Sequence, residues 1–153
     1  MVVVVVVAVA LGIAAGCGGE DELSAEELGR EADRICSDSR AEFAELQQDP
    51  PTSPREAAEL TRQLVAITER EIGAIRGLDA PQDLEPRLDL YLRARDEGLE
   101  ILRAGLAAAV AQDVRGYARA QAAIAARALE RLRLARAAGL RECSRPFSAP
   151  SGK

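Results

Sequence analysis

Residues 53–81, "SPREAAELTRQLVAITEREIGAIRGLDAP", contain one complete amphipathic helix with its start and stop signals. The opening Ser-Pro pair suits a helix start, because serine caps the first turn and proline fits the first helical position. Apolar residues recur every three or four positions, as one buried stripe requires, and Glu71 is an acidic interruption in that stripe. We expect Gly77 to end the helix in the left-handed conformation, with a proline just beyond it. The stretch therefore predicts a helix over residues 54–76.

Similar signals recur along the rest of the chain, where Ala, Leu, Arg and Glu dominate and no stretch shows the period-two pattern of strands. "SAEE" at residues 24–27 is a capping box, and Asp113 offers a cap at a break in the C-terminal half. We expect an all-α fold, an up-down-up-down four-helix bundle closed by one disulfide. The expected segments are a bundle over 24–145, with helices at about 24–48, 54–76, 84–111 and 114–138, and a flexible tail over 146–153.

The first seventeen residues, "MVVVVVVAVALGIAAGC", form an apolar run that ends in small residues and a cysteine. The run is too short to span a membrane comfortably, since a spanning helix needs about 20 residues. It resembles a bacterial lipoprotein signal, so we expect a lipoprotein signal peptide over residues 1–16, lipidation of Cys17 and an acidic tether over 17–23. No Lys or Arg follows Met1, which a start site further upstream would explain. The alternatives are an ordinary cleaved signal peptide with an incidental cysteine, or an uncleaved short anchor.

Two further cysteines, Cys36 and Cys143, remain once Cys17 is set aside. In an exported chain an even pair indicates one disulfide, which would close a loop of about a hundred residues. A reactive thiol is the alternative, but neither cysteine lies in a C-x-x-C pair and the sequence has no His.

The residue types that the sequence lacks narrow its chemistry. It has no His and no Asn, and its single Met is the initiator, so the commonest general base and the commonest metal ligand are both missing. Adjacent acidic residues point to different helical faces, and no Gly-rich phosphate loop is present. A net charge of −5 argues against nucleic acid as the main partner. We therefore expect a protein that is not an enzyme, with no catalytic residues, cofactor or metal site.

Charge is distributed unevenly along the chain. Residues 20–49 carry eleven acidic residues and three arginines, whereas residues 113–145 carry three acidic residues and eight arginines. We expect the first and last helices to be neighbours that pair these charges. The alternative is that arginines of the last helix contact anionic lipid head groups; they are Arg115, Arg119, Arg127, Arg131, Arg133, Arg136 and Arg141.

Three short motifs accompany the lipoprotein signal: "EADRIC" at 31–36, "GLDAP" at 77–81 and "GLREC" at 139–143. Together they resemble small helical extracytoplasmic lipoproteins predicted in actinobacteria, over nearly the whole mature chain. The resemblance implies a helical fold, an extracytoplasmic address and a bond between the two later cysteines. It supplies no activity.

These observations predict a non-enzymatic module that is anchored by its N-terminal lipid to the extracytoplasmic face of the cell membrane. It would bind a protein partner of the cell envelope or space envelope components, through the end formed by "DPPTSP" and "AQDVRG". The alternative is a carrier of a small apolar ligand, since an Ala-rich core with glycines at 73, 98 and 105 could leave a cavity. Close helix packing is the more ordinary use of such small residues.

Overall fold

The computed structural model describes residues 22–146, within which all regular structure is helical. The helices are α1 (Ala25–Leu46), α2 (Pro54–Arg76), α3 (Glu85–Val110) and α4 (Val114–Ala137). Each begins and ends within two residues of the bounds expected from the sequence. Cys17, most of the expected tether and the tail beyond Pro146 lie outside the described residues.

Side-chain caps begin three of the helices. The Ser24 hydroxyl accepts the backbone N–H of Glu27, whose carboxylate accepts the N–H of Ser24, so α1 starts with a complete capping box. Ser53 caps α2 by accepting the N–H of Glu56. Asp113 caps α4 by accepting the N–H of Gly116 at 2.9 Å. These caps fix where each helix starts, as their sequence signals predict.

The chain leaves its helices by two different routes. Gly77 has φ −79°, so the expectation that it adopts the left-handed conformation is wrong; its N–H still bonds to the carbonyl of Gly73. Gly139, at the end of α4, has φ +80° and is the glycine that uses this conformation. Between α3 and α4 the tight reversal is made by Gln112, at φ +57°, immediately before the Asp113 cap.

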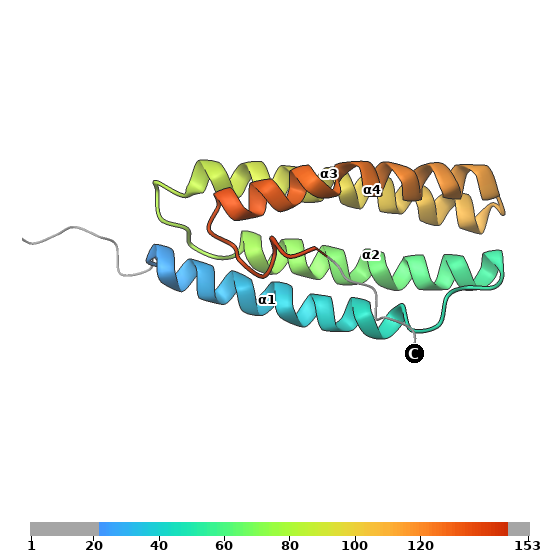
Figure 1. Ribbon diagram of the computed structural model, residues 1–153, viewed down its shortest axis with the longest axis horizontal. Coiled ribbons are helices and arrows are strands. Elements are labelled where there is room, and N and C mark those ends of the chain that lie inside the picture. The colour runs from blue at the N-terminus through green and yellow to red at the C-terminus, as the bar shows by residue number, and fades with distance from the viewer. Residues whose placement is uncertain (1–21, 147–153) are drawn as a thin grey trace, which may run out of the picture.

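The helices lie lengthwise in two layers, with α1 and α2 in one and α3 and α4 in the other (Figure 1). Helices that follow one another in the chain pack together, whereas α1 and α4 make little direct contact. The segment after α4 crosses to α1 and runs along it (Figure 1). The side of the domain between α1 and α4 is therefore covered in part by this C-terminal segment instead of by direct helix packing.

Two groups of buried residues stabilise the arrangement. The larger surrounds Tyr91 and draws on all four helices and on Leu140, which is fully buried after the end of α4. The smaller consists of Ala57, Ala58 and Ala109 near the α1–α2 and α3–α4 connections. Small residues let helices approach closely there.

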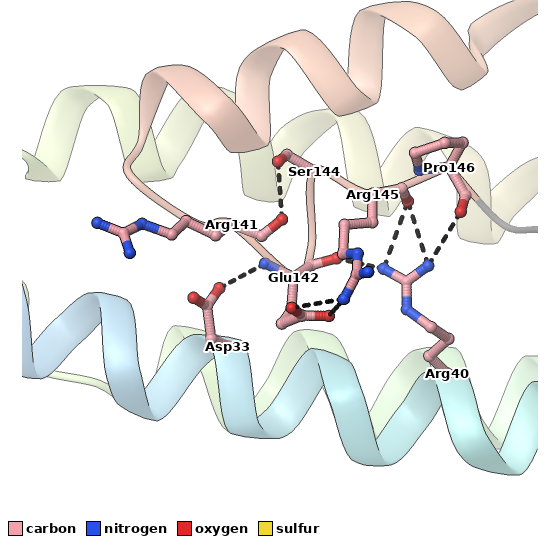
Figure 2. A network of polar contacts seen from close by, with 7 residues as sticks. All are labelled: Asp33, Arg40, Arg141, Glu142, Ser144, Arg145 and Pro146. Carbon is pink, nitrogen blue, oxygen red and sulfur yellow. Dashed lines mark hydrogen bonds and ion pairs between the residues drawn. The ribbon is translucent and has the colours of Figure 1, made fainter.

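The C-terminal segment is attached to α1 by a disulfide. Polar contacts also hold the segment there (Figure 2). The Sγ atoms of Cys36 and Cys143 lie 2.05 Å apart, with 107 residues of sequence separation. Asp33 accepts the N–H of Glu142 at 2.8 Å. The Arg40 guanidinium donates to backbone carbonyls of the segment, including that of Pro146 at 3.1 Å (Figure 2). The end of the described chain is thus held against the middle of α1.

The start of the described chain is also attached, which corrects the expectation of a tether up to residue 23. The N–H of Leu23 donates to the carbonyl of Asp79 at 3.0 Å, and Leu23 packs against the main core. Glu22 accepts the N–H of Gln82 at 2.7 Å. The reason is that an apolar side chain next to the α1 cap has a buried surface within reach. Within residues 22–146, no helix is both long enough and apolar enough to cross a bilayer.

Candidate functional site

A cleft of about 420 Å³ opens on the side of the domain where α1 and α4 are not packed together. Side chains from all four helices and from the C-terminal segment line it. Its volume falls within the range of about 300–1,000 Å³ that is typical of sites for small molecules. The cleft is therefore the candidate functional site.

A buried ion pair forms the floor of the cleft. Nη2 of Arg95 on α3 lies 2.8 Å from Oε1 of Glu71 on α2, and their side chains are only 11% and 7% exposed. The Tyr91 hydroxyl lies 4.0 Å from Sγ of Cys36, and since a disulfide sulfur carries no proton the hydroxyl is the donor in this contact. The polar floor and the disulfide are therefore parts of one cluster.

Burial controls the protonation of this cluster. It raises the pKa of the Glu71 carboxyl, an effect that the positive charges of Arg95 and Arg131 oppose. It also raises the pKa of Tyr91 to about 12, so the phenol is neutral at ordinary pH. Burial, followed by repulsion from Arg95, lowers the pKa of Arg131, although an arginine stays charged in proteins. The positive charges of two arginines thus act on one buried carboxyl group, and Arg95 is the one that forms an ion pair with it within residues 22–146.

The cleft carries more positive than negative charge although the whole chain is acidic. Five arginines and three glutamates line it, a surplus of two positive charges; they are Arg40, Arg95, Arg127, Arg131, Arg145, Glu71, Glu97 and Glu130. The Arg40 guanidinium donates hydrogen bonds to backbone carbonyls, and Nε of Arg127 lies 3.7 Å from Oε2 of Glu97. Arg131, on α4, forms no ion pair with any residue of the described range.

Buried donors of the cleft lack acceptors. Nε and Nη2 of Arg95 have no hydrogen-bond partner among the described residues, because the Glu71 pair has the distance of an ion pair but not the alignment of a hydrogen bond. Nε of Arg40 is also buried without a hydrogen-bond partner among the described residues. A guanidinium offers five N–H donors, so the floor has donor capacity that the protein itself leaves unused.

Apolar side chains form the remaining walls. Leu64, Leu102 and Ile124 line the cleft from three different helices, and Phe43 lines it from α1. Gly98 on α3 also borders it, and a Cβ at this position would meet nothing within 4 Å. The cleft thus joins a cationic floor to an aliphatic wall.

The structure separates the glycines that the sequence grouped as interior. Gly98 borders the cleft, whereas Gly73 is exposed on α2 and does not lie in the core, which corrects that expectation. At Gly105 an added Cβ would lie 3.2 Å from Cβ of Ala120, so this glycine serves the close approach of α3 and α4. Only Gly98 leaves open space beside a lined cavity.

The structure also places the residues that the sequence singled out for chemistry. Cys36 and Cys143 border the cleft, so the disulfide is part of its wall. Of the seven arginines considered for lipid contact, Arg127 and Arg131 line the cleft. The expected charge pairing of α1 with α4 is wrong: no ion pair among residues 22–146 joins them, since the C-terminal segment lies along α1.

The sequence contains one signal for the floor of the cleft, a charged residue within the apolar stripe of each of two neighbouring helices. The spacing of the stripes alone does not show that these two residues form a pair. Glu71 interrupts the apolar stripe of α2, and Arg95 lies four residues from both Tyr91 and Leu99 in the stripe of α3. An acid and a base in the facing stripes of neighbouring helices indicate a buried pair. The surplus cation, Arg131, could be assigned to the same cluster only once the fold was known.

The cleft has room for one small molecule. The ionisable groups of its floor are arginines, a carboxylate paired with Arg95 and a phenol with a pKa of about 12. None of these groups is a nucleophile held beside a general base, the arrangement that covalent catalysis uses. Within the range that the structure describes, no group of three His, Cys, Asp or Glu side chains could hold a metal ion.

No protein-family model, curated protein or solved structure matches this chain. The function is therefore inferred from the geometry and charge of the cleft, together with the address that the sequence predicts.

Proposed function

We propose that the chain is a non-enzymatic, lipid-anchored binding protein of the cell envelope whose cleft holds one small molecule. The observation that carries the proposal is the cleft itself, which joins apolar walls to buried guanidinium N–H groups that have no hydrogen-bond partner among the described residues. Buried polar groups without partners are unfavourable, so a protein that keeps them gains by binding a ligand that supplies acceptors. The proposal therefore favours a carrier over a purely structural module. It places the ligand in a cleft at the side of the bundle and not in a cavity of an Ala-rich core.

Native mass spectrometry of protein purified from its own host tests this proposal. We expect a retained small molecule that is lost when Gly98→Leu fills the cleft, because a side chain at this position extends into open space. Gly73→Leu is the matched control, since Gly73 is a helical glycine with nothing within 4 Å of an added Cβ and lies outside the cleft. The proposal is contradicted if Gly98→Leu retains the small molecule as Gly73→Leu does. It is also contradicted if the wild type retains no small molecule.

The proposed fold is an up-down-up-down bundle in which the C-terminal segment closes part of the side between α1 and α4. The disulfide supports this description, because it fixes the segment to α1 beside the cleft. The proposed address depends on Cys17. The mass of the mature N-terminal peptide tests it: a lipid-modified cysteine is expected, whereas an unmodified thiol contradicts the anchor.

A protein partner at the end opposite the start of α1 is the second candidate function. The α1–α2 and α3–α4 connections lie together at that end (Figure 1). Val110 and Val114 flank the second connection and are 62% and 71% exposed. Crosslinking in the native cell from position 112, compared with position 90 on α3, tests this surface. Equal recovery of partners from both positions contradicts it.

A further inference from the structure

We propose that the ligand of the cleft is a small anionic amphiphile: a carboxylate or phosphate monoester carrying a short aliphatic chain. The head would bind Arg95 and Arg131, and the chain would lie along Leu64, Leu102 and Ile124. This inference rests on the proposed function and adds the chemical class of the ligand.

The anionic head is inferred from the balance of charge and hydrogen bonds on the floor. Within residues 22–146, Glu71 is the one carboxylate that pairs with Arg95, and two Arg95 nitrogens remain buried without a hydrogen-bond partner there. Arg131 adds a second guanidinium that makes no ion pair within residues 22–146. One further anion would balance the pair, and carboxylates and phosphates match the planar fork of a guanidinium.

The aliphatic chain is inferred from the walls. Leu64 from α2, Leu102 from α3 and Ile124 from α4 are branched and aliphatic, and Phe43 adds an aromatic ring to that of Tyr91 on the floor. An inorganic anion would leave this surface exposed to water, whereas an alkyl chain would bury it. The two halves of the cleft thus require a molecule with two unlike ends.

The size and surroundings of the cleft exclude larger anions. A volume of about 420 Å³ holds one small molecule and no folded partner. The whole chain carries a net charge of −5, which disfavours polyanions such as nucleic acids. Glu97 and Glu130 also line the cleft. They would repel a ligand that carries a second anionic group at a distance from Arg95 and Arg131.

Calorimetric titration of the full chain, with Cys17→Ser so that no lipid is attached, tests the ligand class. The probes share one chain length: octanoate, octyl phosphate, octanol and octyltrimethylammonium. We expect one site that binds octanoate or octyl phosphate at least about tenfold more tightly than the neutral and cationic probes. The two anions distinguish a carboxylate ligand from a phosphate ligand.

Matched variants locate the site. Arg131→Gln should weaken binding of the preferred anion at least about tenfold, Arg131→Lys less, and Gly98→Leu should abolish it. Arg136→Gln is the control, because Arg136 lies on the same helix, is exposed and does not line the cleft. Glu71→Gln with Arg95→Gln removes both partners of the buried pair together and leaves Arg131 as the remaining guanidinium of the pair that binds the head, so it should also weaken binding.

Three results overturn the inference. Equal binding of octanol and of both anions would mean that the cleft takes apolar ligands, which leaves the proposed function standing. Equal loss in Arg131→Gln and Arg136→Gln would mean non-specific attraction to surface arginines. Absence of binding by every probe would reject the amphiphile, while ligand retention in protein from the host would still decide the proposed function separately.

Discussion

Removal of the disulfide tests the way in which the C-terminal segment is held on α1. The perturbation is the double variant Cys36→Ala and Cys143→Ala. The two cysteines are only 5% and 8% exposed, so alanine avoids placing a new hydroxyl in the core. Cys17→Ala is the matched control, because it removes a cysteine and leaves the bridge intact.

The expected magnitude follows from the length of the closed loop. With a sequence separation of 107 between the cysteines, the loss of loop-closure entropy predicts about 4.7 kcal/mol, and measured disulfides typically give about 2–4 kcal/mol. A domain of this size is stable by about 5–15 kcal/mol, so the bridge contributes a large share. The contacts of Asp33 and Arg40 with the C-terminal segment survive the substitution, and we therefore expect a weakened but folded protein.

Urea unfolding followed by circular dichroism measures the effect. For an m-value of about 2 kcal/mol per molar, the midpoint should fall by about 1–2 M. The m-value itself should rise, since an unbridged denatured chain exposes more surface. A midpoint that matches the Cys17→Ala control would refute the reasoning, because it would show that the bridge does not constrain the unfolded chain.

Three further predictions follow from the structure. Burial raises the folded-state pKa of Glu71, so the folded protein binds more protons than the unfolded chain between about pH 4.5 and that raised value. We compare the free energy of unfolding of the wild type with that of Glu71→Gln by urea titration at several pH values. The difference, wild type minus variant, should increase as pH falls through this window, by at most about 1.4 kcal/mol per pH unit. A difference that does not change with pH contradicts the prediction. Gly98→Ala and Gly73→Ala should each raise the free energy of unfolding by about 0.5–1 kcal/mol, since both lie in helices with space for a Cβ, and destabilisation by either alanine in thermal melts is the contrary outcome. Arg40→Gln should lower the free energy of unfolding by about 1–3 kcal/mol and speed hydrogen exchange of the N–H of Ser144, whereas unchanged exchange would show that the guanidinium does not hold the segment.

The helices could be predicted from the sequence because their signals are local. Ser24 with Glu27 specifies a capping box, and Ser53 begins a helix that the apolar stripe then continues. Asp113 marks the break before α4 for the same reason. Each of these signals acts within one turn and is independent of tertiary packing.

The cleft could not be predicted, because it depends on packing between distant segments. The charges of α1 and α4 suggested direct pairing, but the C-terminal segment lies along α1 and its carbonyls engage Arg40. Glu71 and Arg95 were visible only as interruptions of apolar stripes. The space beside Gly98 follows from how the helices are spaced, and no local rule specifies that spacing.

The side-chain Nε–H resonances of the arginines give the most direct test of the central claim, that two arginines on the cleft floor bind an anionic head. In the full Cys17→Ser chain, labelled with ¹⁵N-arginine, octyl phosphate or octanoate should shift the resonances of Arg95 and Arg131 and leave that of Arg136, which lies outside the cleft, in place. Saturation should occur at one equivalent of the preferred anion. Shifts spread over the exposed arginines, with Arg95 unmoved, would contradict the account.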